Sequence, residues 1–210
     1  MKRAYEFGKN TASVEIQVSR PMNDPESMAS LDIITQSIAE KTASDLEAKA
    51  KIASANALLQ SKNALQTAGA IDSALEDAID RATVNAASLL VGQGINIGRN
   101  DVFADNSDDL HGLLRSEILD ERTCDFCLSM DSLVVAPDDP WASVDIFHNS
   151  CRGIWIGIMK EEVRPPEITG VPDEIAKYYD GQPNALKQPP KPIVSPGSDA
   201  AKYIAKRDGK

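Results

Sequence analysis

The pattern of apolar and polar residues predicts a long helix in the first third of the chain. Between Leu31 and Gln66 there is neither proline nor glycine, and the apolar positions are separated by alanine and long polar side chains, which favour helix. Residues 24–26, Asp-Pro-Glu, give an acidic first turn to a helix that opens near Ser27. So narrow an apolar seam buries little area, so the helix must pack in a hairpin within the chain or against a neighbouring subunit.

A second helix is predicted after a turn at Gly69, with Asp72 near its start. Its apolar positions recur at i, i+3, i+4 and i+7 and comprise Ile71, Ala74, Leu75, Ala78, Ile79, Ala82, Ala86, Leu89 and Leu90. Gly92, Gly94 and Gly98 predict the end of this helix and an irregular connection. Turn conformation is the favoured role of these glycines, because they form neither a Gly-x-Gly-x-x-Gly pattern nor a P-loop.

Other segments carry the signals of β-strands. The run VEIQV at 14–18 alternates apolar and polar residues, which predicts a short half-buried strand in an N-terminal arm. Residues 112–119, 132–135 and 153–159 predict three further strands. These three are expected to form a small antiparallel sheet.

Composition and charge narrow the functional classes. The chain has 210 residues, of which 42% are hydrophobic and only 5% aromatic, so one or two domains with a modest core are expected. The formal charge of −10 argues against a surface devoted to nucleic acid. No apolar run reaches the roughly 20 residues of a membrane span, and the polar start lacks the apolar stretch of a signal peptide. We therefore expect no membrane contact and a protein that stays in the compartment where it is made.

The three cysteines and one of the two histidines form two close pairs. Cys124 and Cys127 are followed, after twenty residues, by His148 and Cys151. Two such pairs supply a Cys3His shell for tetrahedral Zn²⁺, and the proline-containing loop between them is free to bring the pairs together. With four protein ligands the site is closed, which predicts a structural zinc that stabilises the small sheet and no catalytic residues.

Three other interpretations of these residues stay open. Cys124 and Cys127 match a redox Cys-x-x-Cys pair, but that motif precedes a helix in a βαβ unit and leaves the second pair unexplained. Cys151 with His148 as nucleophile and base lacks an orienting partner. Simple burial of unreactive cysteines is the third interpretation. His111 stands apart from the cluster and is interpreted as a loop residue.

The segment RSEILDERTCDFCLSMDSLVV, followed by FHNSCRG, resembles the C-terminal signature of phage minor head proteins, the Mu F-like head morphogenesis domain family. The residues that match are Leu119, Asp120, Arg122, Thr123, Cys124, Cys127, Asp131, His148, Cys151 and Arg152. The preceding helix also resembles the family, in its stretch with Asn96, Gly98 and Arg99, so the resemblance spans about Ile71 to Lys160. The chain departs from the family at Ser132, Asn149 and Gly153, which stand where the family often has glycine, proline and a last cysteine.

The resemblance implies a non-enzymatic virion protein that acts in head morphogenesis. Its expected partners are portal and/or major capsid protein subunits in a multi-copy assembly, with DNA contact at most secondary. Its expected location is the head or portal region of the virion, and the host cytoplasm during assembly. Two alternatives are a zinc-containing nucleic-acid-binding or DNA-packaging accessory protein, and a toxin-associated domain. The acidic balance of residues 120–162 counts against the first, and the helical half offers no catalytic constellation for the second.

The predicted fold class is α+β, with a helical N-terminal half, a small zinc-bound antiparallel sheet and an extended proline-rich tail. The expected divisions are an N-terminal arm at 1–26, a helical region at 27–95, the zinc-binding head morphogenesis domain at 96–163 and the tail at 164–210. The tail holds eight of the twelve prolines and few large apolar residues. It is therefore expected to lack a core of its own and to become ordered only against neighbouring subunits.

Overall fold

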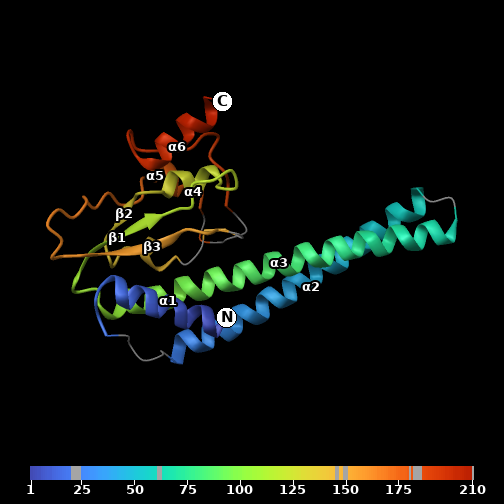
Figure 1. Cartoon of the computed structure of the whole chain (residues 1–210), viewed down its shortest axis with the longest axis horizontal. Coiled ribbons are helices and arrows are strands. Elements are labelled where there is room, and N and C mark those ends of the chain that lie inside the picture. Colours follow the sequence, from blue (N-terminus) through green and yellow to red (C-terminus); the bar gives the residue numbers. More distant parts are fainter. Residues whose placement is uncertain are drawn as a thin grey trace.

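The chain has an α+β fold in this computed structural model, which describes residues 1–19, 25–60, 63–144, 147–148, 151–179, 181 and 186–209. The helices are α1 (Lys2–Glu15), α2 (Pro25–Gln60), α3 (Ala64–Asp105), α4 (Asp125–Met130), α5 (Asp173–Ala176) and α6 (Asp199–Asp208), with a short 3-10 helix η1 (Pro140–Ser143). The strands are β1 (Leu110–Ser116), β2 (Val134–Val135) and β3 (Ile154–Met159). Figure 1 shows the sheet between α1 and α3 on one side and α4, α5 and α6 on the other.

Helices α2 and α3 form an antiparallel hairpin that projects away from the sheet (Figure 1). The two helices pack along each other with Leu31 and Ala57 of α2 and Ala78 and Ala82 of α3 buried. Other apolar residues of the predicted seams, such as Ile52 and Ile79, are exposed. Of the two packings left open by the sequence, the intramolecular hairpin is confirmed. None of the helices in the described part of the chain is long and apolar enough to cross a membrane.

The predicted turn of this hairpin is wrong by several residues. Gly69 and Asp72 lie inside α3, which begins at Ala64. Asn63 caps this helix, since its side-chain oxygen accepts a hydrogen bond from the backbone N–H of Gln66 at 2.9 Å. A capped start satisfies a backbone donor that is otherwise unpaired, whereas one glycine inside a helix is only mildly destabilising.

The strand predicted at 14–18 is also wrong, because this part of the chain is helical up to Glu15. The buried residues of α1 include Tyr5, Gly8 and Ala12, a helical spacing that places one face of α1 against α3. Ile16 follows α1 and is buried in the main core. The alternating run was too short to distinguish a strand from the last turn of a helix whose long-range contacts decide its structure.

The predicted end of the second helix at 92–98 is wrong, since α3 continues to Asp105. Gly94 and Gly98 serve close helix packing instead of a turn, whereas a Cβ on Gly92 would make only an ordinary contact with the carbonyl oxygen of Cys151. A Cβ on Gly98 would overlap the backbone of Tyr5 in α1, and a Cβ on Gly8 would overlap the backbone of Ile95 in α3. The expected division between residues 95 and 96 therefore falls inside a continuous helix.

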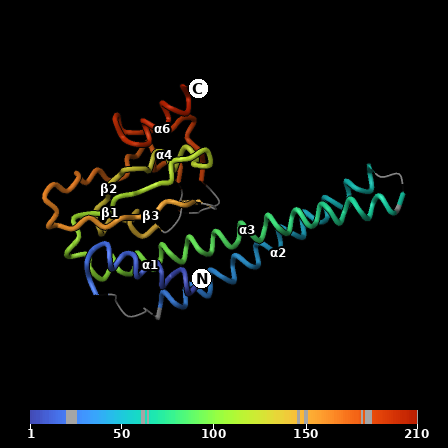
Figure 2. Tube along the Cα trace, in the orientation of Figure 1, coloured from blue at the N-terminus to red at the C-terminus, as the bar shows by residue number. Residues whose placement is uncertain are grey.

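The three predicted strands are confirmed as a small antiparallel sheet in the order β2-β1-β3, each shorter than its expected segment. Leu113 of β1 pairs with Val135 of β2 and with Gly157 of β3. His111 lies on β1 and not in a loop, and its Nε2 is 2.9 Å from the carbonyl oxygen of Pro166. Figure 2 follows the chain from α3 directly into β1, which fixes the sheet to the base of the hairpin.

The described part of the tail packs against the sheet domain, so the expectation that it orders only on neighbouring subunits is wrong. Ile175 of α5 is 2% exposed and belongs to the main core cluster. Tyr179 contacts an aromatic group in which its ring centroid is 5.4 Å from that of Trp141 and 5.9 Å from that of Phe147. Few apolar residues were enough to dock the tail, because they meet a surface that the sheet and α4 already provide. The expected extended tail thus includes two helices, α5 and α6.

Candidate metal centre

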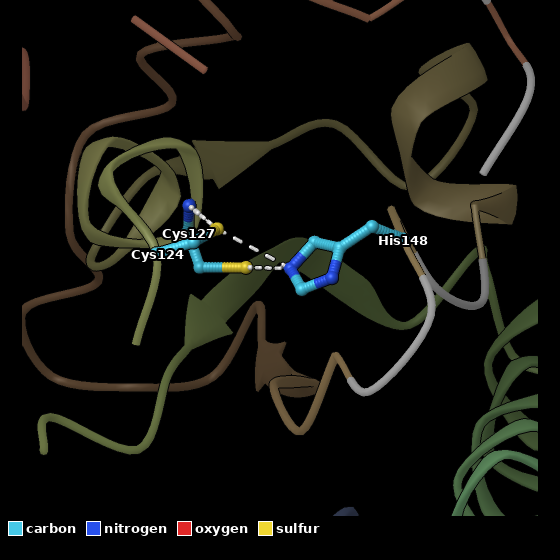
Figure 3. A group of neighbouring side chains, drawn as sticks. All are labelled: Cys124, Cys127 and His148. Atoms are coloured by element: carbon cyan, nitrogen blue, oxygen red, sulfur yellow. Dashed lines mark hydrogen bonds between the residues drawn. The ribbon is translucent and has the colours of Figure 1, made fainter. Parts of the chain in front are cut away.

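The first cysteine pair is positioned by the start of α4. Cys124 is the N-cap residue, with φ −72° and ψ 160°, and its sulfur accepts a hydrogen bond from the backbone N–H of Cys127 at 3.4 Å. A cap side chain turns back over the first helical turn, so both sulfurs point to the same side of α4 (Figure 3). The helix connects antiparallel strands and not the parallel strands of a βαβ unit, which removes the context that a thioredoxin-type redox pair requires.

The second pair arrives from the segment that precedes β3. His148 and Cys151 are joined by a turn in which the backbone N–H of Cys151 donates to the carbonyl oxygen of His148 at 3.0 Å. The Nε2 atom of His148 lies 3.3 Å from Sγ of Cys124 and 3.1 Å from Sγ of Cys127 (Figure 3). The Sγ atom of Cys151 lies 3.8 Å from Sγ of Cys127. The structure therefore brings together all four residues that the spacing predicted.

These distances fit the ligand shell of a metal ion. The ligand atoms of Cys124, Cys127 and His148 all lie within 4.8 Å of one another. Zn–S bonds of about 2.3 Å and Zn–N bonds of about 2.0 Å in a tetrahedron place two sulfurs about 3.8 Å apart and a sulfur about 3.5 Å from a nitrogen. The sulfur pair matches this value, and the sulfur–nitrogen pairs are a few tenths of an ångström shorter. The sulfur of Cys151 groups instead with Cys127 and Glu117, so the cluster can hold a metal ion on all four ligands once this sulfur moves closer to Cys124 and His148.

The protonation of the three thiols favours metal binding. A hydrogen bond from the Cys127 thiol, with a further contribution from His148, lowers the pKa of Cys124 to about 4. The Cys127 thiol also lowers the pKa of Cys151, and the nearby Arg115 guanidinium acts in the same direction. The pKa of Cys127 is raised, because its proton is shared with both neighbours. The lowered pKa values of Cys124 and Cys151 favour their thiolate forms, and the thiolate is the form of cysteine that binds a metal ion.

A buried ion pair between Arg115 and Glu117 lies next to the cluster. It was not predicted from the sequence. Nη2 of Arg115 donates to Sγ of Cys151 at 3.2 Å, while its Nε donates to Oε1 of Glu117 at 2.7 Å. The side chain of Arg115 is fully buried, and its guanidinium lies over the rings of Phe147 and Trp155, at 4.4 and 5.3 Å from their centroids. A Zn²⁺ ion bound by three thiolates and one imidazole would give the site a net charge of −1, which the nearby Arg115 guanidinium would stabilise.

Gly153 leaves no room for a side chain. A Cβ at this position would overlap the carboxylate of Glu117. The carboxylate of Glu117 thus takes the space that a cysteine side chain at 153 would need. Burial raises the pKa of Glu117 to about 7 despite the opposing effect of Arg115.

A second ion pair closes the outer side of the cluster. The guanidinium of Arg152 donates to both carboxylate oxygens of Asp120, at 2.7 and 2.5 Å. Asp120 also accepts from the backbone N–H of Arg122 at 2.9 Å, as expected for the aspartate of a turn. These contacts join the segment before Cys124 to the segment after Cys151, so the residues around the cysteines have structural roles.

The hollow directly at the cluster is small. The hollow lined by Glu117, the three cysteines, His148 and Arg152 has a volume of about 10 Å³. That is about the volume that one water molecule requires. This geometry is typical of a closed structural metal site.

No protein-family model, no curated protein and no solved structure matches the chain in comparisons with known proteins.

Proposed function

We propose that the Cys124, Cys127, His148 and Cys151 cluster binds one structural Zn²⁺, and that the chain is a minor head protein acting in phage head morphogenesis. The observation that carries this proposal is the convergence of the two cysteine-containing segments that resemble the Mu F-like family. They meet in one closed cluster, tied on its outer side by Asp120 and Arg152.

The choice of zinc follows from the ligand set. Three sulfurs and one imidazole nitrogen suit Zn²⁺ and not the oxygen-preferring Mg²⁺ or Ca²⁺. Such an ion would supply the folding energy of a small sheet, and no reaction step is assigned to it. Arg115 would hold Cys151 in position for this ion, through the contact described above.

A role in assembly agrees with the shape of the molecule. A compact domain carries a long projecting hairpin with exposed apolar side chains, among them Leu59 and Leu65, each 84% exposed. Such surfaces are typical of proteins that contact other subunits. We propose portal and/or major capsid subunits as the partners, in a multi-copy assembly, with the virion head or portal region as the location. The acidic charge disfavours DNA binding as the primary role.

The zinc assignment is tested by metal analysis of the purified chain. One zinc per chain is expected in the wild type and in a His111→Ala variant, whose histidine lies on β1 away from the cluster. A His148→Ala variant is expected to bind zinc far more weakly. Absence of zinc from the wild type, or full zinc content in the His148→Ala variant, would overturn this part of the proposal.

The assembly role is tested in the phage that encodes the chain. An amber mutation in its gene is expected to give defective or unstable heads, which a plasmid carrying the wild-type or His111→Ala gene restores. A plasmid carrying the His148→Ala gene is expected to fail. Normal yields of infectious heads from the amber mutant, or substrate turnover by the purified protein, would contradict the proposal.

A further inference from the structure

The hairpin lacks the buried area that two long helices need. Among the described residues, the distal half of α2 packs along α3 and along no other element (Figures 1 and 2). The buried positions of this contact are alanines, namely Ala57, Ala78 and Ala82. Alanine contributes little apolar surface, and most of the stability of a helix in a protein comes from packing an apolar face. The distal hairpin would therefore gain stability from further apolar contacts with another helix.

One face of the hairpin is hollowed along the line where α2 and α3 meet. A groove of about 360 Å³ near the tip is lined by Ile52 and Asn56 of α2 and by Ala70 and Ala74 of α3. Lys49 lines this groove as well as a second hollow of about 160 Å³ that continues towards the base of the hairpin. Ile52 stands at the groove with 61% of its surface exposed. The face thus presents an apolar side chain next to a hollow lined by small residues.

The charges of the two helices differ in the same region. From residue 48 to residue 60, α2 carries two lysines, Lys49 and Lys51, and no acidic residue. From residue 64 to residue 80, α3 carries four acidic residues, among them Glu76 and Asp77, and no basic residue. Within the described residues no ion pair links these segments of α2 and α3, Lys49 has no ion-pair partner, and Asp77 pairs with Arg81 of its own helix at 3.5 Å. At 3.6 residues per turn Asp77 lies on the side of α3 next to the groove residue Ala74, whereas Glu76 lies on the opposite side. A basic residue of a partner helix can therefore reach Asp77 at this face.

We propose that the groove face binds the same face of a second copy of this chain, so that two hairpins form a four-helix bundle. A two-fold axis parallel to the hairpins places each α2 beside the α3 of the other copy. Residues at the same height within one hairpin then meet across the interface. Ile52 of one copy packs between Ala70 and Ala74 of the other, and Lys49 lies level with Asp77. Each contact occurs twice, and each joins opposite charges or complementary shapes.

The area of this face is sufficient for a stable dimer. Residues 38–60 of α2 span about 34 Å at 1.5 Å per residue, and two helices side by side are about 20 Å wide. The face therefore covers about 700 Å² on each copy, close to the roughly 800 Å² per partner of specific complexes. This inference does not rest on the proposed head function, since it concerns only the hairpin and a second copy.

The association is tested by sedimentation equilibrium of the zinc-loaded full chain. A dimer with a Kd of about 10 µM or tighter is expected, because interfaces of this size range from micromolar to picomolar affinity. An Ile52→Asp variant should weaken the dimer at least tenfold. Ile33→Asp is the matched control, since Ile33 lies on α2 near the base, outside both hollows, and is 69% exposed. A wild type that is monomeric at about 100 µM, or equal effects of the two variants, would overturn the proposal.

Exchanging the charges of residues that meet across the interface distinguishes loss of the dimer contact from unfolding of the chain. A Lys49→Glu chain and an Asp77→Lys chain should each be monomeric, because like charges then meet at both α2–α3 contacts. Mixed together they should form a heterodimer, in which every such contact again joins opposite charges. Circular dichroism checks that each variant keeps its helices. Failure of the folded variants to associate on mixing would show that these two helices do not meet across a dimer interface.

Discussion

The packing of α1 on α3 predicts that adding a single methyl group at Gly98 strongly destabilises the protein. In a Gly98→Ala variant the new Cβ lies within 3.0 Å of the carbonyl carbon of Tyr5 and of the backbone nitrogen of Lys9, and closer still to the carbonyl oxygen of Tyr5. These are backbone atoms of α1, so no rotation of a side chain relieves the overlap. The whole of α1 must move away by about 1 Å.

That movement is opposed by contacts along the whole of α1. Oη of Tyr5 donates to Asp101 at 2.5 Å, and the carboxylate of Glu15 accepts from Arg99 at 2.6 Å and from the backbone N–H of Gly157 at 2.7 Å. Overpacking costs about 1–3 kcal/mol, and the loss of one of these hydrogen bonds to a charged group adds about 1.5 kcal/mol. Alanine favours the helix over glycine by about 1 kcal/mol, which offsets part of this cost. We expect a net loss of about 3 kcal/mol in the free energy of unfolding.

The matched control is Gly69→Ala in the same helix. A Cβ at Gly69 meets no atom within 4 Å, so only the helix preference applies and the variant should be more stable by about 0.5–1 kcal/mol. Urea unfolding followed by circular dichroism, with zinc present, measures both changes. Equal stability of Gly98→Ala and wild type would show that α1 does not approach α3 at this glycine.

Three further predictions concern the metal centre and its surroundings. Chelation of the metal should lower the urea midpoint of the wild type but leave that of a Cys124→Ser/Cys151→Ser variant unchanged; equal sensitivity of the two would argue against metal-dependent folding. Arg115→Met should lose about 3–5 kcal/mol of stability because it leaves the buried Glu117 carboxylate without its partner, and an added Glu117→Gln change should recover part of this loss. If the double variant is no more stable than Arg115→Met, the lost ion pair is not the cause. The Arg152 guanidinium holds the pKa of Asp120 well below its usual range. This ion pair therefore stabilises the protein at pH values above the pKa that Asp120 has in the unfolded chain, and the stabilisation is lost as the pH falls towards the lower pKa that Asp120 has in the folded protein. A carboxyl ¹³C titration should therefore place the Asp120 midpoint below the usual value of about 3.9, and an Arg152→Gln variant should return it there; a normal midpoint in the wild type would refute the pair.

The sequence predicted the parts of the molecule whose signals are local. The spacing of Cys124, Cys127, His148 and Cys151 identified four residues that lie together, because two short pairs need only a loop that closes back. The strands at the centre of the chain were found from their apolar runs. Arg115 was missed because an arginine within a strand pattern usually marks the solvent side, and nothing nearby in the sequence shows that its partner is a cysteine thirty-six residues later.

The errors share one physical cause. A glycine has the same local signal whether it permits a turn or a close approach of two helices. For Gly98 the decision comes from Tyr5, which is far away in the sequence and packs on α3 only in the folded chain. The alternating residues 14–18 were likewise assigned to a strand although Ile16 is buried by a core assembled from distant segments. Contacts of this kind override local preference, and they cannot be predicted from the local pattern of a single sequence.

The metal centre and the hairpin are connected through β3, and this connection gives the proposed zinc a role beyond stabilising the sheet. β3 begins three residues after Cys151, and the carbonyl oxygen of Trp155 in β3 accepts two hydrogen bonds from Arg99 of α3, at 3.0 and 2.8 Å. The ring of Trp155 also lies under the guanidinium of Arg115, which holds Cys151. A displacement at the metal ligands is therefore transmitted through a buried strand to the base of α3. In a protein whose hairpins must meet those of another copy, a rigid link of this kind sets the direction in which the hairpin projects. Loss of the metal should then weaken association of the hairpins even though no metal ligand lies in α2 or α3.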